Sequence, residues 1–322
     1  MRREPLAARR RTVAATVLAA AAVLVAVVAG ATSRQAHAGG AATPHRGGTL
    51  TLLGQSDIFN LDNTSAYYTV SSLLARAYTR QLFGYAASPS FLKSIQLQPD
   101  IASAVPTKGN GGISADGKTM IIHLKSGVKW NSSPPRDVTA GDFVRQYKYL
   151  CNPASPTAAP AYYTSTIVGM KAYCDGFTKV KATVAAINAY ANGHKLAGVA
   201  APNDRTLVFH LLHPTQDFLN IISMPFGSPR PVEYTKYVPD SAQFRQHTLA
   251  NGPYEITKYT PTKGFELDRN PAWDPKTDTL RKAYVDKIKV TEGLTQDNVQ
   301  QQLEAGTADM EWDVTPPAQD LP

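Results

Sequence analysis

The stretch Asp116–Leu150 constrains the fold more than any other part of the chain, because it predicts a hairpin turn, a strand, a second turn and a capped helix in unbroken order. Gly117 supplies the positive φ that a tight hairpin turn requires. Met120–Lys125 is β-branched and alternates as a half-buried strand does. Pro134–Pro135 then keeps the chain extended, and Thr139 follows in the N-cap position of a predicted helix.

The same region contains a lookalike of a nucleotide-binding motif. Gly112–Thr119 matches the phosphate-loop pattern G-x-x-x-x-G-K-T. A working phosphate loop needs a buried strand before it and a helix directly after it, because the helix N-terminus holds the phosphates. Here a polar, glycine-rich segment comes before the motif and the predicted strand Met120–Lys125 comes after it. We therefore interpret the match as a coincidence and predict no nucleotide site.

The N-terminus predicts export. Residues 12–33 carry no charge and follow three consecutive arginines, which is typical of a signal peptide or an N-terminal membrane anchor, so we assign residues 1–38 to one or the other. Ala36–Ala38 and Ala29–Ala31 both fit a cleavage site, and residues 39–48 form a small-residue linker. No cysteine stands directly after the apolar segment, which excludes a lipobox lipoprotein. We expect the protein on the extracellular or periplasmic face, released or tethered by its uncleaved leader.

The net charge of +8 does not indicate nucleic-acid binding. Residues 1–38 hold six arginines and one glutamate, so they account for +5 and leave about +3 for the rest of the chain. A phosphate-binding surface needs its basic residues gathered in a stripe or patch. The remaining basic residues are scattered, so we predict no nucleic-acid partner.

Cys151 and Cys174 are the two cysteines of the sequence. In an exported protein an isolated pair is predicted to form a disulfide, worth about 3 kcal/mol in loop-entropy terms. It would join the end of the helix that starts at Thr139 to the segment around Tyr173. Two free buried thiols are the alternative. No histidine or cysteine pair stands at zinc-ligand spacing near either residue, so we predict no metal site.

Five sequence blocks occur in an order that resembles a known family. They are Gly47–Thr51, Arg76–Tyr85, Leu97–Ala102, Asp116–Phe143, and the pair Asn251–Tyr254 with Leu267–Pro271. The order is similar to family 5 of the extracytoplasmic solute-binding proteins, the peptide, dipeptide and nickel-chelate binders of ABC importers. One departure is Asn131–Pro135, which replaces the family's usual "D-G-x-P" without removing the capped helix.

The resemblance implies an α/β fold, a periplasmic-binding-protein-like lobe of type II (cluster C) with a mixed β-sheet and an inserted α+β subdomain. Residues 49–87 and 203–311 would form lobe I, residues 88–202 the inserted subdomain, and residues 312–322 the start of the crossover to a second lobe. Family members are far longer than 322 residues. We therefore expect the second lobe to be missing from this chain, as in a gene fragment or a split protein.

The resemblance also implies a function: a monomer that captures oligopeptides or similar small solutes outside the membrane and delivers them to ABC permease subunits. Such proteins close two lobes around the ligand, so we expect one lobe alone to bind peptides weakly. The candidate wall residues by family position are Gln55, Ser56, Asp57, Tyr67, Tyr68 and Trp312. Each has a plainer alternative, since Asp57 could serve a turn and the tyrosines could be half-buried packing residues.

Two other classes of function compete with this one. A secreted hydrolase is disfavoured, because the sequence has no G-x-S-x-G elbow and no H-E-x-x-H motif. An anchored surface or sensory protein that uses the lobe without transport stays open, because the leader could remain uncleaved. His123, His210 and His213 are predicted to be ordinary strand or surface residues. We expect no catalytic residue, no metal and no cofactor.

Overall fold

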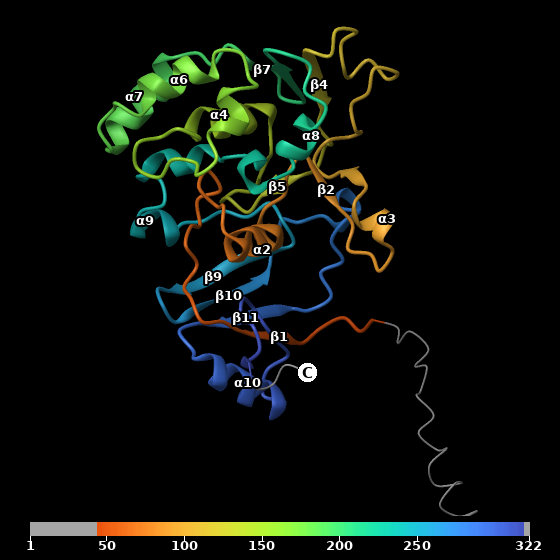
Figure 1. Ribbon diagram of the computed structural model, residues 1–322, viewed down its shortest axis with the longest axis vertical. Helices are drawn as coiled ribbons and strands as arrows, with labels where there is room; N and C mark the ends of the chain where they lie inside the picture. Colours follow the sequence, from red (N-terminus) through yellow and green to blue (C-terminus); the bar gives the residue numbers. More distant parts are fainter. Residues whose placement is uncertain (1–43, 319–322) are drawn as a thin grey trace, which may run out of the picture. The chain divides into compact units, whose positions relative to one another are not determined.

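The computed structural model describes residues 44–318, and the predicted leader, residues 1–38, lies outside them (Figure 1). Within the described part, no helix has both the length and the apolar composition to cross a membrane. Two sheets carry most of the architecture. They are joined by short helices and two small hairpins.

The larger sheet has five strands in the order β12-β1-β11-β10-β9. Its strands are β1 (Thr49–Leu53), β9 (Tyr254–Thr260), β10 (Gly264–Arg269), β11 (Lys287–Thr291) and β12 (Met310–Glu311). β1 runs parallel to both β11 and β12, whereas β10 is antiparallel to β9 and β11. The sheet is therefore mixed, and it places the first described strand between two strands from the far end of the chain (Figure 1).

This sheet has one apolar and one charged face. Val290 lies opposite Leu52 on one side and Phe265 on the other, and all three are buried. Helix α2 (Thr69–Tyr78) contributes Leu74 and Tyr78 to the same hydrophobic cluster. On the other face, alternating residues such as Lys258, Glu266 and Lys289 are solvated, as the two-residue period of a strand requires.

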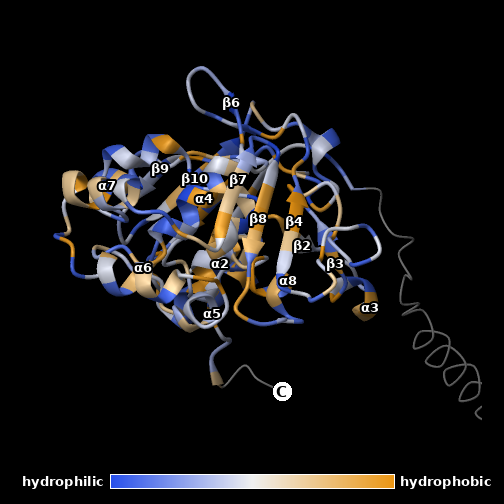
Figure 2. Ribbon diagram, turned by 90° about the horizontal axis from the view of Figure 1, so that it is seen from above, coloured by the Kyte–Doolittle hydropathy of each residue, from blue (hydrophilic) through white to orange (hydrophobic). Residues whose placement is uncertain are grey.

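The smaller sheet is antiparallel, with the order β4-β8-β7. Its strands are β4 (Thr119–His123), β7 (Val199–Asn203) and β8 (Thr206–His210). Helix α4 (Ala140–Tyr149) packs against β7 and β8, and Figure 2 shows apolar residues along β4 and β8. The helices α6 (Met170–Phe177) and α7 (Val184–Gly193) complete this region. Its core includes Trp130, Phe143, Tyr147 and Phe209.

Short elements connect these parts. Two small hairpins pair β2 (Phe83–Tyr85) with β3 (Leu97–Pro99) and β5 (Lys129–Trp130) with β6 (Arg136–Asp137). The remaining helices are α3 (Phe91–Ser94), α5 (Ala161–Thr164), α8 (Phe218–Ile221), α9 (Ala242–Arg245) and α10 (Gln296–Glu304). Three 3-10 turns are η1 (Pro225–Gly227), η2 (Val232–Lys236) and η3 (Pro275–Thr277).

The segment Asp116–Leu150 folds as its sequence predicts. Gly117 has a φ of 71°, and its N–H donates to the Ser114 carbonyl at 2.9 Å in a tight turn. The strand β4 follows the motif where a phosphate loop would need a helix. This agrees with the interpretation of the motif match as a coincidence. Thr139 caps α4 in a capping box, with its N–H donating to Asp142 Oδ2 at 3.1 Å.

The end of α4 is tied to α6 by a covalent bond. Cys151, just after α4, forms a disulfide with Cys174 in α6, and their Cα atoms are 5.2 Å apart. Both residues are buried in the core of the smaller sheet. The disulfide therefore restrains the long loop between these two helices.

A group of four buried charges lies where the two hydrophobic cores adjoin. Arg80 Nε is 2.8 Å from Asp100 Oδ1, and Arg281 Nη1 is 2.8 Å from Asp100 Oδ2 and 3.3 Å from Asp278 Oδ2. In the sequence, Arg80 lies between Tyr78, which belongs to the core of the larger sheet, and Leu82, which belongs to the core of the smaller sheet. We call Arg80, Asp100, Asp278 and Arg281 the Arg80–Asp100 cluster. Its two positive and two negative groups balance.

Candidate functional site

The candidate site lies where three parallel strands end. After β1 the chain leaves the sheet at Gly54, whose N–H donates to the Thr291 carbonyl at 2.8 Å. After β12 it leaves at Trp312, whose N–H donates to the Leu53 carbonyl at 2.7 Å. In open α/β sheets, ligands bind beyond the carboxyl ends of parallel strands, where loops diverge. We call this region the strand-end edge.

Three predicted site residues, Gln55, Ser56 and Asp57, form the loop after β1. Gln55 and Ser56 are exposed, and the Gln55 N–H donates to Asp313 Oδ1 at 3.3 Å. Asp57 is half-buried and accepts hydrogen bonds from the Tyr259 hydroxyl at 3.1 Å and from the Thr262 N–H at 3.0 Å. Asp57 thus ties this loop to the turn between β9 and β10.

Trp312 belongs to the same edge but faces inward. A Cβ atom placed on Gly54 would lie 3.1 Å from Trp312 Cδ1, so the ring packs directly on the backbone there. The ring also meets Phe265 edge-on, with centroids 5.7 Å apart. Its Nε1 is buried and has no hydrogen-bond acceptor among the described residues. Trp312 therefore covers the strand ends from within.

Tyr67 and Tyr68 lie on the segment before α2 and have other contacts. Each is 53% exposed. Tyr68 stacks on Phe59 with ring centroids 4.1 Å apart, and Tyr67 faces Phe226 at 6.1 Å. Their ring contacts share no residue with the hydrogen bonds of Asp57. Phe59, which is 47% exposed, was not predicted as a site residue. Its place in the loop after the first strand is the sequence feature that could have indicated it.

Glu292 is the most unusual residue of the strand-end edge, and the sequence analysis missed it. It directly follows β11, is 3% exposed, and neither carboxyl oxygen has a hydrogen-bond partner among the described residues. Burial, together with the nearby negative charges of Asp57 and Asp313, raises the pKa of Glu292 to about 8. The one sequence feature that could have indicated Glu292 is its position between a β-branched strand and a glycine. The edge thus holds a carboxyl group that keeps its proton at neutral pH.

Comparison with known proteins identifies this architecture. The model of the bacterial extracellular solute-binding proteins, family 5, middle region, matches residues 96–321. The chain belongs to this family. The predicted fold class, a type II periplasmic-binding-protein-like α/β lobe with a mixed sheet, is confirmed. The predicted limits of lobe I and of the inserted subdomain stay predictions.

Individual relatives of this family-5 chain are distant. "Probable deoxycholate-binding periplasmic protein YgiS" of Escherichia coli (strain K12) is 25% identical over 206 residues, which cover 64% of this chain and 34% of the relative. "Oligopeptide-binding protein OppA" of Bacillus subtilis (strain 168) is 26% identical over 188 residues, covering 57% and 30%. The chain therefore spans about a third of the length of these curated relatives.

A solved structure covers more of the chain. "Clavulanic acid biosynthesis oligopeptide binding protein 2" superposes with a TM-score of 0.71 at 25% identity, over 86% of this chain and 46% of that chain. The likeness therefore extends over nearly the whole described part. This chain corresponds to just under half of that structure.

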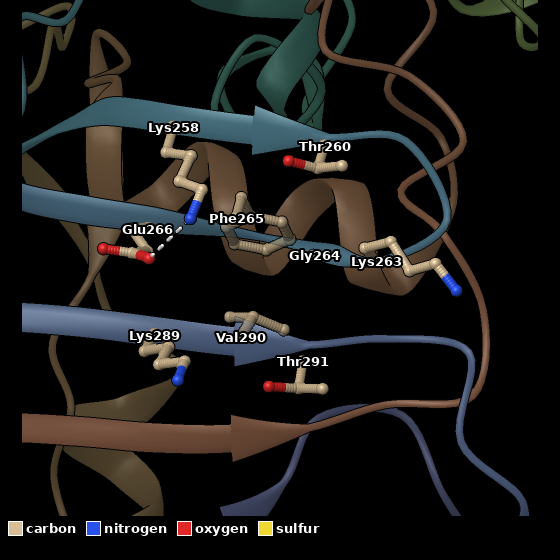
Figure 3. Close-up of a pocket in the computed structure, with 9 residues that line it drawn as sticks. All are labelled: Lys258, Thr260, Lys263, Gly264, Phe265, Glu266, Lys289, Val290 and Thr291. Atoms are coloured by element: carbon tan, nitrogen blue, oxygen red, sulfur yellow. Dashed lines mark hydrogen bonds and ion pairs between the residues drawn. The ribbon is translucent and has the colours of Figure 1, made fainter.

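The charged face of the larger sheet has a small hollow at the ends of β9, β10 and β11 (Figure 3). Its volume is about 110 Å³, below the roughly 300 Å³ at which small-molecule sites begin. Glu266 pairs there with Lys258 at 3.4 Å and with Lys287 at 3.1 Å. The hollow is therefore a weak candidate for the ligand site of a family-5 protein.

The described residues offer no arrangement suited to a metal ion. Across residues 44–318, no group of three or more His, Cys, Asp or Glu side chains is arranged to hold a metal ion. His123 and His210 each lie within hydrogen-bond distance of a threonine on the paired strand, at 3.4 and 3.3 Å. His213 contacts the Ser165 carbonyl at 3.2 Å. These contacts are those of ordinary strand and surface residues.

Proposed function

We propose that this family-5 chain is the ligand-binding component of an ABC importer and captures oligopeptides or similar small solutes outside the membrane. The observation that carries the proposal is the family match over residues 96–321. Relatives with oligopeptide binding in their names support the ligand class. They are binding proteins, which favours a binding role over a catalytic one.

We propose that the strand-end edge is one wall of the ligand site. Gln55 and Ser56 are exposed and carry free polar groups, which suits hydrogen bonding to a peptide backbone. Asp57 and Trp312 fix the loops from which these residues project. Tyr67 and Tyr68 would add apolar contact area at the rim, as amphipathic rings do at binding surfaces.

We also propose the surrounding organisation. Residues 49–87 and 203–311 would form lobe I, residues 88–202 the inserted subdomain, and residues 312–322 the start of the crossover. The leader would export the protein, and permease subunits in the membrane would receive the ligand. Both the ligand and these partners are expectations for the whole importer component.

A second ligand class has one observation in its favour. The E. coli relative is named for deoxycholate, a rigid and mainly apolar solute. The exposed stack of Phe59 on Tyr68 offers apolar area of the kind that such a molecule would cover. Small amphipathic solutes are therefore the alternative to peptides.

Calorimetry on the full chain tests both classes. The probes would be a tetrapeptide mixture and deoxycholate below its micellar concentration. We expect Tyr68→Ala to weaken binding of the true ligand at least fivefold, because it removes a half-exposed ring from the wall. Tyr162→Ala is the matched control, since Tyr162 is 41% exposed on α5. Heat from neither probe, or equal losses in both variants, would contradict the proposal.

A further inference from the structure

Three acidic residues lie at the strand-end edge, each beyond the end of a different one of three neighbouring parallel strands. Asp57 follows β1, Glu292 follows β11 and Asp313 follows β12. Asp57 and Asp313 are the charges that act on the Glu292 carboxyl. Asp313 is exposed, Asp57 is half-buried and Glu292 is 3% exposed, so the group leads from solvent into the protein. We call these residues the carboxyl trio.

No cation of the described residues neutralises the trio. Asp57 accepts from a tyrosine hydroxyl and a backbone N–H, and Asp313 accepts from the Gln55 N–H, all uncharged donors. Both oxygens of Glu292 lack a partner within the described part. The trio therefore holds more acidic groups than its surroundings balance.

Two basic residues, Arg245 and Lys263, contact groups that neighbour the trio but form no ion pair with it. Arg245 reaches the Tyr259 hydroxyl at 3.1 Å, but its guanidinium pairs with Asp240 at 2.9 Å. The backbone carbonyl of Lys263 accepts a hydrogen bond from the Glu292 N–H at 3.0 Å. The Lys263 side chain instead borders the hollow on the charged face of the sheet (Figure 3). Neither residue supplies the missing positive charge.

A buried carboxyl group without a cation is costly, and such a group keeps its proton instead of ionising. This is the state of Glu292 at neutral pH. A positive group placed beside the trio would reverse the preference, because an opposite charge within about 4–6 Å favours the ionised form. The trio is therefore arranged to exchange a proton for a cation.

We propose that Asp57, Glu292 and Asp313 form a subsite for one cationic group of the ligand, an ammonium or a guanidinium, and that this group displaces the proton of Glu292 into solvent. The inference rests on the proposed function and specifies the charge that its ligand carries. The cation enters past exposed Gln55 and Asp313 and is held by charge-assisted hydrogen bonds. Charge balances, because one proton leaves for each cation bound.

Calorimetry on the full chain tests the subsite with two N-acetylated tetrapeptide amides that differ only in lysine or norleucine at one position. We expect the lysine peptide to bind at least tenfold more tightly at pH 7. Titrations in phosphate and in Tris, which differ in ionisation enthalpy, should report release of about 0.9 proton per lysine peptide, as expected for a group titrating about one unit above the working pH.

Variants separate the subsite from the rest of the site. Glu292→Gln cannot ionise, so it should release no proton and reduce the preference for lysine to about twofold. Asp313→Asn alters an exposed residue and should reduce the preference severalfold even if the buried variant folds poorly. Glu266→Gln, on the charged face of the sheet, is the matched control and should keep both effects.

The two levels of the hypothesis fail differently. Equal affinity for the two peptides, or tight lysine-peptide binding without proton release, would overturn the subsite and leave the proposed function standing. If neither peptide binds to any form of the chain, the proposed peptide-binding function fails together with the subsite.

Discussion

Two groups of acidic side chains, each with at least one buried carboxyl group, differ in the presence of positive partners. The Arg80–Asp100 cluster contains two arginines and two aspartates, joined by ion pairs of 2.8 to 3.3 Å. The carboxyl trio contains three acidic residues and no arginine or lysine that pairs with them in the described part. A balanced group holds elements together, whereas an unbalanced group leaves room for a charge from outside.

The pKa values of the two groups express the same difference. Burial alone would raise the pKa of Asp100, but Arg281 and Arg80 more than offset this and lower it. Burial also raises the pKa of Glu292, and there Asp57 and Asp313 add to the shift instead of opposing it, so that the pKa reaches about 8. The first carboxylate therefore stabilises the fold in its charged form, and the second in its neutral form.

Asp100→Ala should have the largest effect, because it leaves Arg80 and Arg281 buried without their shared partner. Removing one partner of a buried pair costs about 3–5 kcal/mol. Urea denaturation at pH 7 would measure the loss of unfolding free energy. A loss below about 1 kcal/mol would mean that the cluster is solvated and would weaken the comparison.

Glu292→Gln should have the next largest effect, and at pH 7 it should raise the free energy of unfolding where Asp100→Ala lowers it. The folded pKa of Glu292 lies above its unfolded value, so wild-type stability is full below about pH 4.5 and falls until about pH 8. At about 1.4 kcal/mol per pH unit, the loss between pH 5 and 7 is about 3 kcal/mol. Urea denaturation across this range should show a flatter profile for the variant. Parallel profiles would contradict the assignment.

Tyr259→Phe should have a smaller effect. Its hydroxyl donates to Asp57 at 3.1 Å and accepts from Arg245 at 3.1 Å, so the variant leaves both groups with one partner fewer. We expect a loss of about 1 kcal/mol, the usual net worth of a hydrogen bond. Thermal unfolding would measure it, with Tyr162→Phe, at an exposed tyrosine of α5, as the control that should leave the midpoint unchanged.

Lys171→Met should have the smallest effect. Lys171 pairs with Asp175 at 2.7 Å on the surface of α6, where the side chains are 73% and 56% exposed. Exposed pairs of this kind contribute less than about 0.5 kcal/mol. Denaturation at low and high salt should therefore give nearly equal values. A loss comparable to that of Asp100→Ala would show that burial does not decide how much an ion pair contributes to the stability of this protein.

Local sequence determined what could be predicted of the fold. The turn at Gly117 and the capped start of α4 at Thr139 depend on residues within a few positions of each other. The disulfide partner of Cys151 could be predicted because only one other cysteine exists. These features need no knowledge of tertiary packing.

The candidate site was harder to predict because its residues meet through pairing of distant strands. Gln55, Asp57 and Trp312 share the strand-end edge only because β1 lies between β11 and β12. Glu292 is unremarkable in the sequence, since its burial and its missing partners arise only in the folded structure. Whether any of these residues touches a ligand stays a prediction.

The position of β1 also has a consequence for how the chain acquires its structure. Thr49 is paired with Lys287, and Leu52 with Met310. Both edges of β1 therefore form their hydrogen bonds with strands more than 200 residues further along the sequence. Closing so long a loop before any pairing is gained makes folding slow. A polypeptide emerging N-terminus first from a ribosome or a membrane pore would therefore hold β1 unpaired until β11 and β12 had emerged. Assembly of this sheet has to wait for segments that lie far from β1 in the sequence.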